Sequence, residues 1–98
     1  TIIFDEIDTG VSGEVAYKIA DIMNHMGKYM QVITITHLPQ VAAKGAHHFK
    51  VFKETRDGST FTQLKKLQQQ ERIEEVAQML AGDDLSDTAL QHAKELLN

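Results

Sequence analysis

The fold is decided by the stretch Thr1-Ile2-Ile3-Phe4-Asp5-Glu6-Ile7-Asp8. Its first half is an unbroken apolar run, which is typical of a strand buried on both faces, as in a parallel sheet. The run stops abruptly at acidic residues, and a loop containing Gly10 and Gly13 follows. Because chemistry in parallel sheets gathers at the carboxyl ends of the strands, this pattern predicts a functional edge next to Asp5 and Glu6.

The residues that follow predict alternating helices and strands. Apolar side chains recur at helical spacing over residues 14–26, with Ser12 placed as an N-cap and Gly27 at the end. Alternating β-branched residues over 31–36 predict a second strand, and a short helix over 39–44 starts at a proline. The order strand, helix, strand, helix predicts a parallel α/β layer.

The second half of the chain has a different pattern. Two runs over 48–54 and 59–67 flank Arg56-Asp57-Gly58, which predicts a β-hairpin. Two helices should follow, the first ending at Gly82 and the second capped by Ser86. The expected fold class is therefore α/β, with parallel strands and helices followed by a hairpin and two C-terminal helices.

Composition excludes several classes of function. The 98 residues carry a net charge of −4 and no basic stripe, so no direct DNA-binding patch is visible. Cysteine is absent, which removes disulfides and thiolate metal sites. No apolar run approaches the ~20 residues that a membrane span needs, so no membrane partner is expected.

Asp5 and Glu6 are the first candidates for chemistry. Successive strand residues point to opposite sides, so the pair should perform two tasks rather than one. One carboxylate can hold Mg²⁺, and its neighbour can orient or deprotonate an attacking water. A strand end finished by two solvated acids is an equally good interpretation of this pair alone.

His37 follows the second strand, within Thr36-His37-Leu38-Pro39. The carboxyl ends of parallel strands meet at one edge, so its imidazole should lie near Asp5 and Glu6. There it could donate a hydrogen bond to a phosphate oxygen without acting as a base. A lone histidine at a strand end is more often an ordinary surface residue. The G-x-x-x-x-G-K-[ST] phosphate loop occurs nowhere in the chain, so Gly10, Ser12 and Gly13 are not read as one.

Three runs together resemble one protein family. They are Thr1-Ile2-Ile3-Phe4-Asp5-Glu6-Ile7-Asp8, Gly10-Val11-Ser12-Gly13 and Thr36-His37-Leu38-Pro39-Gln40-Val41-Ala42. They resemble the head of RecN, a bacterial double-strand-break repair family of the SMC and ABC class of ATPases. The tail Ala93-Lys94-Glu95-Leu96-Leu97 is similar as well, and the resemblance spans essentially the whole chain. It implies that residues 1–98 are the C-terminal portion of one P-loop ATPase head.

The resemblance implies a role for each matching residue. Asp5 corresponds to the Walker B aspartate that organises Mg²⁺, and Glu6 to the catalytic glutamate that polarises the attacking water. His37 corresponds to the switch histidine that senses the γ-phosphate of ATP. The D-loop, which reaches across a dimer of heads, is matched by Asp8, Gly10, Ser12 and Gly13. Ser12 stands where many relatives carry an aspartate.

The resemblance also implies what the whole protein does. We expect part of the ATP-binding and ATP-hydrolysing head of a DNA repair and recombination protein, cytoplasmic and associated with the nucleoid. Heads would associate as dimers, and DNA would be bound through the full-length protein. Walker A, the signature motif and the coiled coil are absent from these 98 residues. The chain begins within a core strand, so we expect a fragment that is inactive alone and has an open sheet edge favouring self-association.

Two other classes of function fit the same sequence. Asp5, Glu6, Asp8 and His37 could surround Mg²⁺ or Mn²⁺ in a stand-alone metal-dependent hydrolase. The hairpin and last two helices could instead form a non-catalytic module that docks a partner. Replacing Glu6 by glutamine separates the ATPase head from the docking module, since only the ATPase should lose turnover. A start codon near Thr1 would favour the stand-alone hydrolase.

Overall fold

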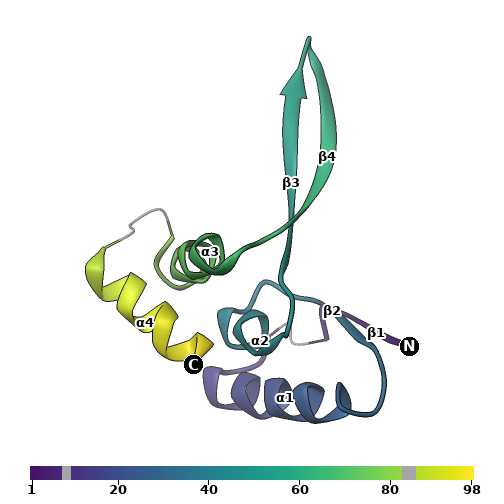
Figure 1. The fold of residues 1–98 in the computed structure, drawn as a ribbon, viewed down its shortest axis with the longest axis vertical. Coiled ribbons are helices and arrows are strands. Elements are labelled where there is room, and N and C mark those ends of the chain that lie inside the picture. Colours follow the sequence, from purple (N-terminus) through teal and green to yellow (C-terminus); the bar gives the residue numbers. More distant parts are fainter. Residues whose placement is uncertain (8–9, 83–85) are drawn as a thin grey trace.

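The computed structural model of the chain describes residues 1–7, 10–82 and 86–98. Figure 1 shows the course of the chain through this part, with a long hairpin projecting from a body of helices. The elements are, in order, β1 (Ile2–Asp5), α1 (Gly13–Met26), β2 (Val32–Ile35), α2 (Pro39–Lys44), β3 (Phe49–Arg56), β4 (Ser59–Lys66), α3 (Gln69–Ala81) and α4 (Asp87–Leu97). The predicted element order is confirmed, with boundaries that differ by a few residues.

The two strands that carry the candidate residues form a parallel pair. Ile2 lies opposite Val32, and Asp5 lies opposite Ile35. The main chain continues this pairing at the carboxyl end, where the Glu6 N–H donates to the Ile35 carbonyl at 2.8 Å. The predicted parallel arrangement of these strands is therefore confirmed, with α1 as the helix that connects them.

One face of this sheet is covered by helices. Phe4 packs against Ala20 and Met23 of α1 and Val41 of α2. Ile3 on the other face is 63% exposed, and Ile35 is 50% exposed. The prediction of a strand buried on both faces is therefore wrong for the described residues, because α1 and α2 lie on the same side of the sheet.

The last two helices form a second apolar cluster. Val76 and Ala77 of α3 pack against Ala89 and Ala93 of α4. The start of α4 is fixed by Ser86, whose hydroxyl oxygen accepts from the Ala89 N–H at 3.2 Å.

No helix in the described part of the chain is long and apolar enough to cross a membrane.

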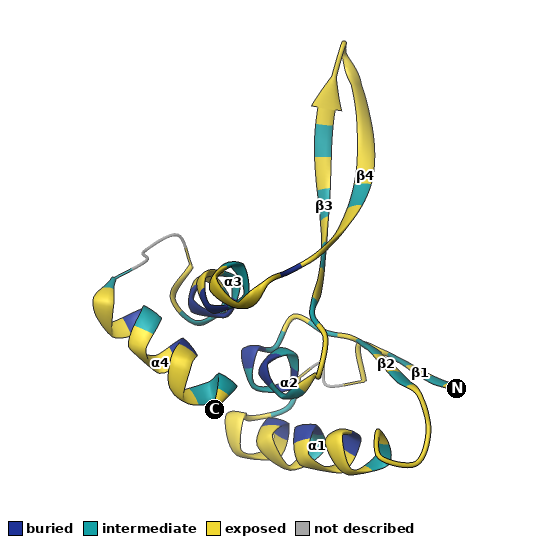
Figure 2. Cartoon of the chain, in the orientation of Figure 1, coloured by how far each residue is buried: buried dark blue, intermediate teal, exposed yellow. Residues whose placement is uncertain are grey.

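The β3–β4 hairpin projects away from both clusters (Figure 1). Its two-residue turn has positive φ at Asp57 (49°) and Gly58 (78°), as a type I′ turn requires. Figure 2 shows that most of the hairpin is exposed. At its base, Lys50 pairs with Glu75 of α3 at 2.8 Å, and Lys65 pairs with Glu71. The hairpin is thus attached to the body mainly through the first turns of α3.

Candidate functional site

An acidic residue and a histidine meet at the carboxyl edge of the parallel sheet. Glu6 follows β1 directly, and His37 lies two residues beyond the end of β2. The Nδ1 atom of His37 is 3.8 Å from Oε1 of Glu6. The two residues are 31 positions apart in sequence. Parallel pairing of β1 with β2 therefore produces the proximity that the sequence predicts.

Glu6 has an unusual backbone. Its φ is 51°, in the left-handed region that non-glycine residues rarely occupy. The predicted alternation of Asp5 and Glu6 across a strand is therefore wrong for Glu6, because β1 ends at Asp5 and the chain turns at the next residue. Such a conformation costs on the order of 1–3 kcal/mol and is often found at functional sites. The Glu6 N–H bond to Ile35 holds the residue in this turn.

The loop that carries His37 is held by local hydrogen bonds. The Leu38 N–H donates to the Thr36 side-chain oxygen at 3.0 Å, which folds the chain across His37. Pro39 then occupies the first turn of α2, where its fixed φ suits a helix start. The Ala42 N–H donates back to the Leu38 carbonyl at 3.0 Å. His37 is thus anchored between β2 and a short helix.

The Glu6–His37 pair is open to solvent. The side chains of His37 and Glu6 are 64% and 57% exposed. Exposed ion pairs contribute only about 0–1 kcal/mol to stability, so this contact alone adds little to the stability of the folded chain. Asp5 is also exposed, at the end of β1 beside Ile35 of β2. All three side chains can therefore be reached by a ligand.

The loop before α1 lies next to the His37 region. Gly10 has φ 81°, and Ser12 caps α1 by accepting from the Val15 N–H at 3.5 Å. A Cβ on Gly13 would lie 3.7 Å from Nε2 of Gln40, so the starts of α1 and α2 are neighbours. Asp8, the remaining D-loop candidate, lies outside the described residues. The contact across a dimer remains a prediction.

The donor set of the site bears on the metal question. Among the described residues, no group of three or more histidine and acidic side chains could hold a metal ion. Magnesium is commonly bound through one or two carboxylates, with water and substrate phosphates completing its shell. The carboxylate of Asp5 fits a magnesium ion that arrives with a nucleotide. Asp8, the remaining ligand candidate of the hydrolase alternative, lies outside the described residues, so that alternative remains a prediction.

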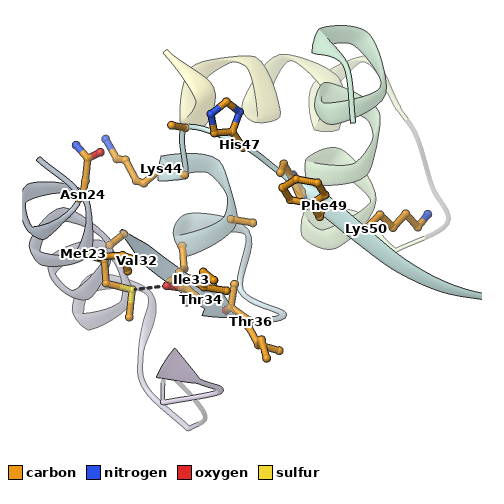
Figure 3. Close-up of a pocket in the computed structure, with 18 of the residues that line it drawn as sticks. Met23, Asn24, Val32, Ile33, Thr34, Thr36, Lys44, His47, Phe49 and Lys50 are labelled. Carbon is orange, nitrogen blue, oxygen red and sulfur yellow. Dashed lines mark hydrogen bonds between the residues drawn. The ribbon is translucent and has the colours of Figure 1, made fainter. Parts of the chain in front are cut away.

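A wide groove runs beside the site between β2 and the start of β3. Figure 3 shows Ile33 and Thr34 on one side and Phe49 and Lys50 on the other. Thr34 donates to the sulfur of Met23 at 3.4 Å, which closes the α1 side of the groove. His37 lines the same groove. Its lining is mainly apolar by area, and Lys28, Lys44 and Lys50 also line it.

Arg72 was missed by the sequence analysis. From the first turns of α3, its guanidinium reaches backbone carbonyls at the end of α2, 27 to 30 residues earlier in the chain. Helical periodicity marks Arg72 only as a polar position on α3. No sequence signal connects it to α2, because its acceptors are main-chain oxygens that every residue carries.

Searches against known proteins relate the chain to one group. No family model matches it. The DNA repair protein RecN of Bacillus subtilis is 50% identical over 99% of the chain, and that of Vibrio cholerae is 44% identical over the same share. RecN of Deinococcus radiodurans is 42% identical, again over 99% of the chain. The chain spans about 17–18% of the length of these relatives.

Proposed function

We propose, from the premise that this chain corresponds to the C-terminal segment of a RecN protein, that it completes the ATP-hydrolysing head of a DNA repair protein. The names of its relatives support the role in DNA repair. The mixed helices and strands, with a parallel pair carrying the acids, are compatible with a P-loop ATPase head. A larger protein would supply the nucleotide-cradling loop, the signature motif and the DNA-binding surface.

The observation that carries this proposal is the meeting of Glu6 and His37 at 3.8 Å. Two residues that follow separate parallel strands converge at the edge where α/β proteins bind their ligands. Gly13, at the start of α1, lies next to Gln40 of α2, the helix that follows the His37 loop. A structural role alone would not require a strained glutamate and an exposed histidine side by side.

In the proposed reaction each side chain has one task. Bound ATP would supply the phosphoryl group that is transferred, and bound magnesium would neutralise its negative charge. Asp5 would hold the magnesium through its carboxylate, directly or through water. Glu6 orients the attacking water and accepts its proton while the water oxygen bonds to the terminal phosphorus and the bond from that phosphorus to the departing ADP breaks. His37 donates an imidazole N–H to an oxygen of the terminal phosphate, where charge develops in the transition state.

The proposal is tested with Glu6→Gln in the full-length protein. Glutamine keeps the shape of the side chain but cannot accept a proton. Turnover of ATP should fall by roughly 100-fold or more, since general bases contribute on the order of 10²–10⁴. Nucleotide binding should persist, and the dimer of heads should become more stable. The measurement is steady-state hydrolysis, with nucleotide binding and sedimentation measured on the same samples.

Glu95→Gln on exposed α4 makes the same chemical change away from the site and should leave turnover unaltered. Unaltered turnover in Glu6→Gln as well would contradict the proposal and favour the docking-module alternative. Cells carrying Glu6→Gln should also fail to repair double-strand breaks.

A further inference from the structure

We infer that Arg72 is a positioning residue for His37 and acts through α2. This inference rests on the proposed function, because it concerns the placement of the histidine beside the terminal phosphate. It assigns to the α3 arginine a task that is separate from packing. Four observations support it: the contacts of the guanidinium, its burial, the shortness of α2, and the way α3 itself is held.

The guanidinium of Arg72 closes the C-terminal end of α2. Its Nη2 atom donates to the carbonyl oxygens of Ala42 and Ala43, each at 3.1 Å, and also to that of Gly45. The last carbonyls of any helix lack partners within the helix. They also form the negative end of its dipole, which favours a cation. Arg72 therefore satisfies and neutralises the end of a helix that belongs to a different part of the chain.

This contact is made at an energetic cost. Burial lowers the pKa of Arg72, and its Nε atom is buried without an acceptor among the described residues. Arginine nevertheless stays charged in proteins. Moving a charge out of water is unfavourable unless specific hydrogen bonds compensate for it. The two N–H groups of Nη2, shared among the three carbonyl oxygens, provide part of that compensation, which favours one position of the guanidinium.

A shift at one end of α2 reaches the other end. The helix has six residues, so it is only about 9 Å long. It starts at Pro39, two residues after His37, and Val41 is buried against α1. A helix this short, with a proline at its start, moves as one body. Loss of the hydrogen bonds from Arg72 to the C-terminal end of α2 would therefore displace the loop that carries His37.

Arg72 is itself held in place by its neighbours on α3. Glu71 accepts from the Gln68 N–H at 3.2 Å and pairs with Lys65 of β4. Glu75 pairs with Lys50 of β3 at 2.8 Å. Burial and the positive charge of Arg72 both lower the pKa of His48, whose ring lies at the same junction. The first turns of α3 thus connect the hairpin base with α2.

A double-mutant cycle in the full-length protein tests the inference. Arg72→Met keeps an unbranched apolar stem and removes the guanidinium with its hydrogen bonds to α2. It should lower kcat for ATP by roughly 10- to 100-fold, the cost expected for misplacing a catalytic group by about 1 Å. KM should change little, since His37 acts on the transition state. In a His37→Ala background the same substitution should cause no further loss.

The cycle also separates positioning from general damage. If Arg72→Met reduces kcat equally with and without His37, Arg72 acts independently of the histidine and the inference is wrong. Arg56→Met, at the exposed hairpin tip, makes the same exchange away from α2 and should not alter kcat. If Arg72→Met does not fold, Arg72→Lys replaces it under the same criterion, with a smaller loss expected.

Failure of the proposed function gives a different result. In that case His37→Ala and Glu6→Gln would leave turnover unchanged whatever Arg72 does. Loss of turnover in those two variants, together with an additive effect of Arg72→Met, would overturn only the positioning role.

Discussion

At the scale of single residues, the surroundings of His48 disfavour its charged form. It precedes β3 and is half-buried, and its Nδ1 atom finds no hydrogen-bond partner among the described residues. Burial is the main cause that lowers its pKa from the ordinary 6.5. The positive charges of Arg72 and Lys50 lower it further, against an opposing effect of Glu75. The folded chain therefore favours the neutral imidazole.

The first prediction is that His48 makes the protein less stable in mild acid. Its folded pKa lies below 6.5, so the unfolded chain binds more protons as the pH falls through that value. Stability should be fully present above pH 6.5 and decline below it. Urea unfolding at about pH 7.5 and about pH 5 measures the difference. His48→Gln should reduce it.

The matched control is His92→Gln, which alters an exposed histidine on α4 and should leave the difference unchanged. An unaltered pH dependence in His48→Gln would show that its burial does not couple to folding.

The candidate catalytic residues could be predicted from the sequence better than the residues that hold them in place. Asp5, Glu6 and His37 follow short apolar strands, and the rule that parallel strands end at one edge brings them together. The left-handed turn at Glu6 could not be predicted, because the residue carries no preference for it. Arg72 could not be predicted either, since it recognises main-chain oxygens that are the same for every residue.

At the scale of the elements, the β1–β2 sheet has two open edges. Each strand has one hydrogen-bonded neighbour within the described part of the chain. Its uncovered face carries Ile3, Ile33 and Ile35, which are between 43% and 63% exposed. Open strand edges with apolar side chains are places where further strands add. The self-association that we expect would therefore use the β1–β2 sheet.

The second prediction concerns that surface. The isolated 98-residue chain should associate in solution, and Ile33→Lys should shift it toward the monomer because a charge on the sheet opposes strand addition. Light scattering over a range of concentrations gives the mass. Ile22→Lys, a change of the same kind on exposed α1, should not have this effect. A stable monomer of the unmodified chain at high concentration would argue against the open sheet.

Element types and order could be predicted because local signals agree with the fold. The helical spacing over α1, the caps at Ser12 and Ser86, and the Asp57-Gly58 turn all act over a few residues. The exposure of Ile3 could not be predicted in this way. An apolar run indicates that a strand tends to be covered, but it does not identify what covers it.

At the scale of the whole molecule, the described chain is two small apolar clusters joined around α2. One lies between α1, α2 and β1, and the other lies between α3 and α4. Helix α2 contacts α1, α3 and α4, and the hairpin extends from this junction (Figure 1). Periodicity predicts each helix but not this arrangement, which depends on contacts between residues far apart in sequence.

The central claim is that Glu6 and His37 converge on the terminal phosphate of a bound nucleotide. The most direct measurement is a structure of the full-length protein with magnesium, ADP and a metal fluoride that mimics the transferred phosphoryl group. We expect the fluoride within hydrogen-bond reach of the His37 imidazole, with the Glu6 carboxylate next to the attacking water and Asp5 at the magnesium. A fluoride bound elsewhere, with neither Glu6 nor His37 beside it, would contradict the account.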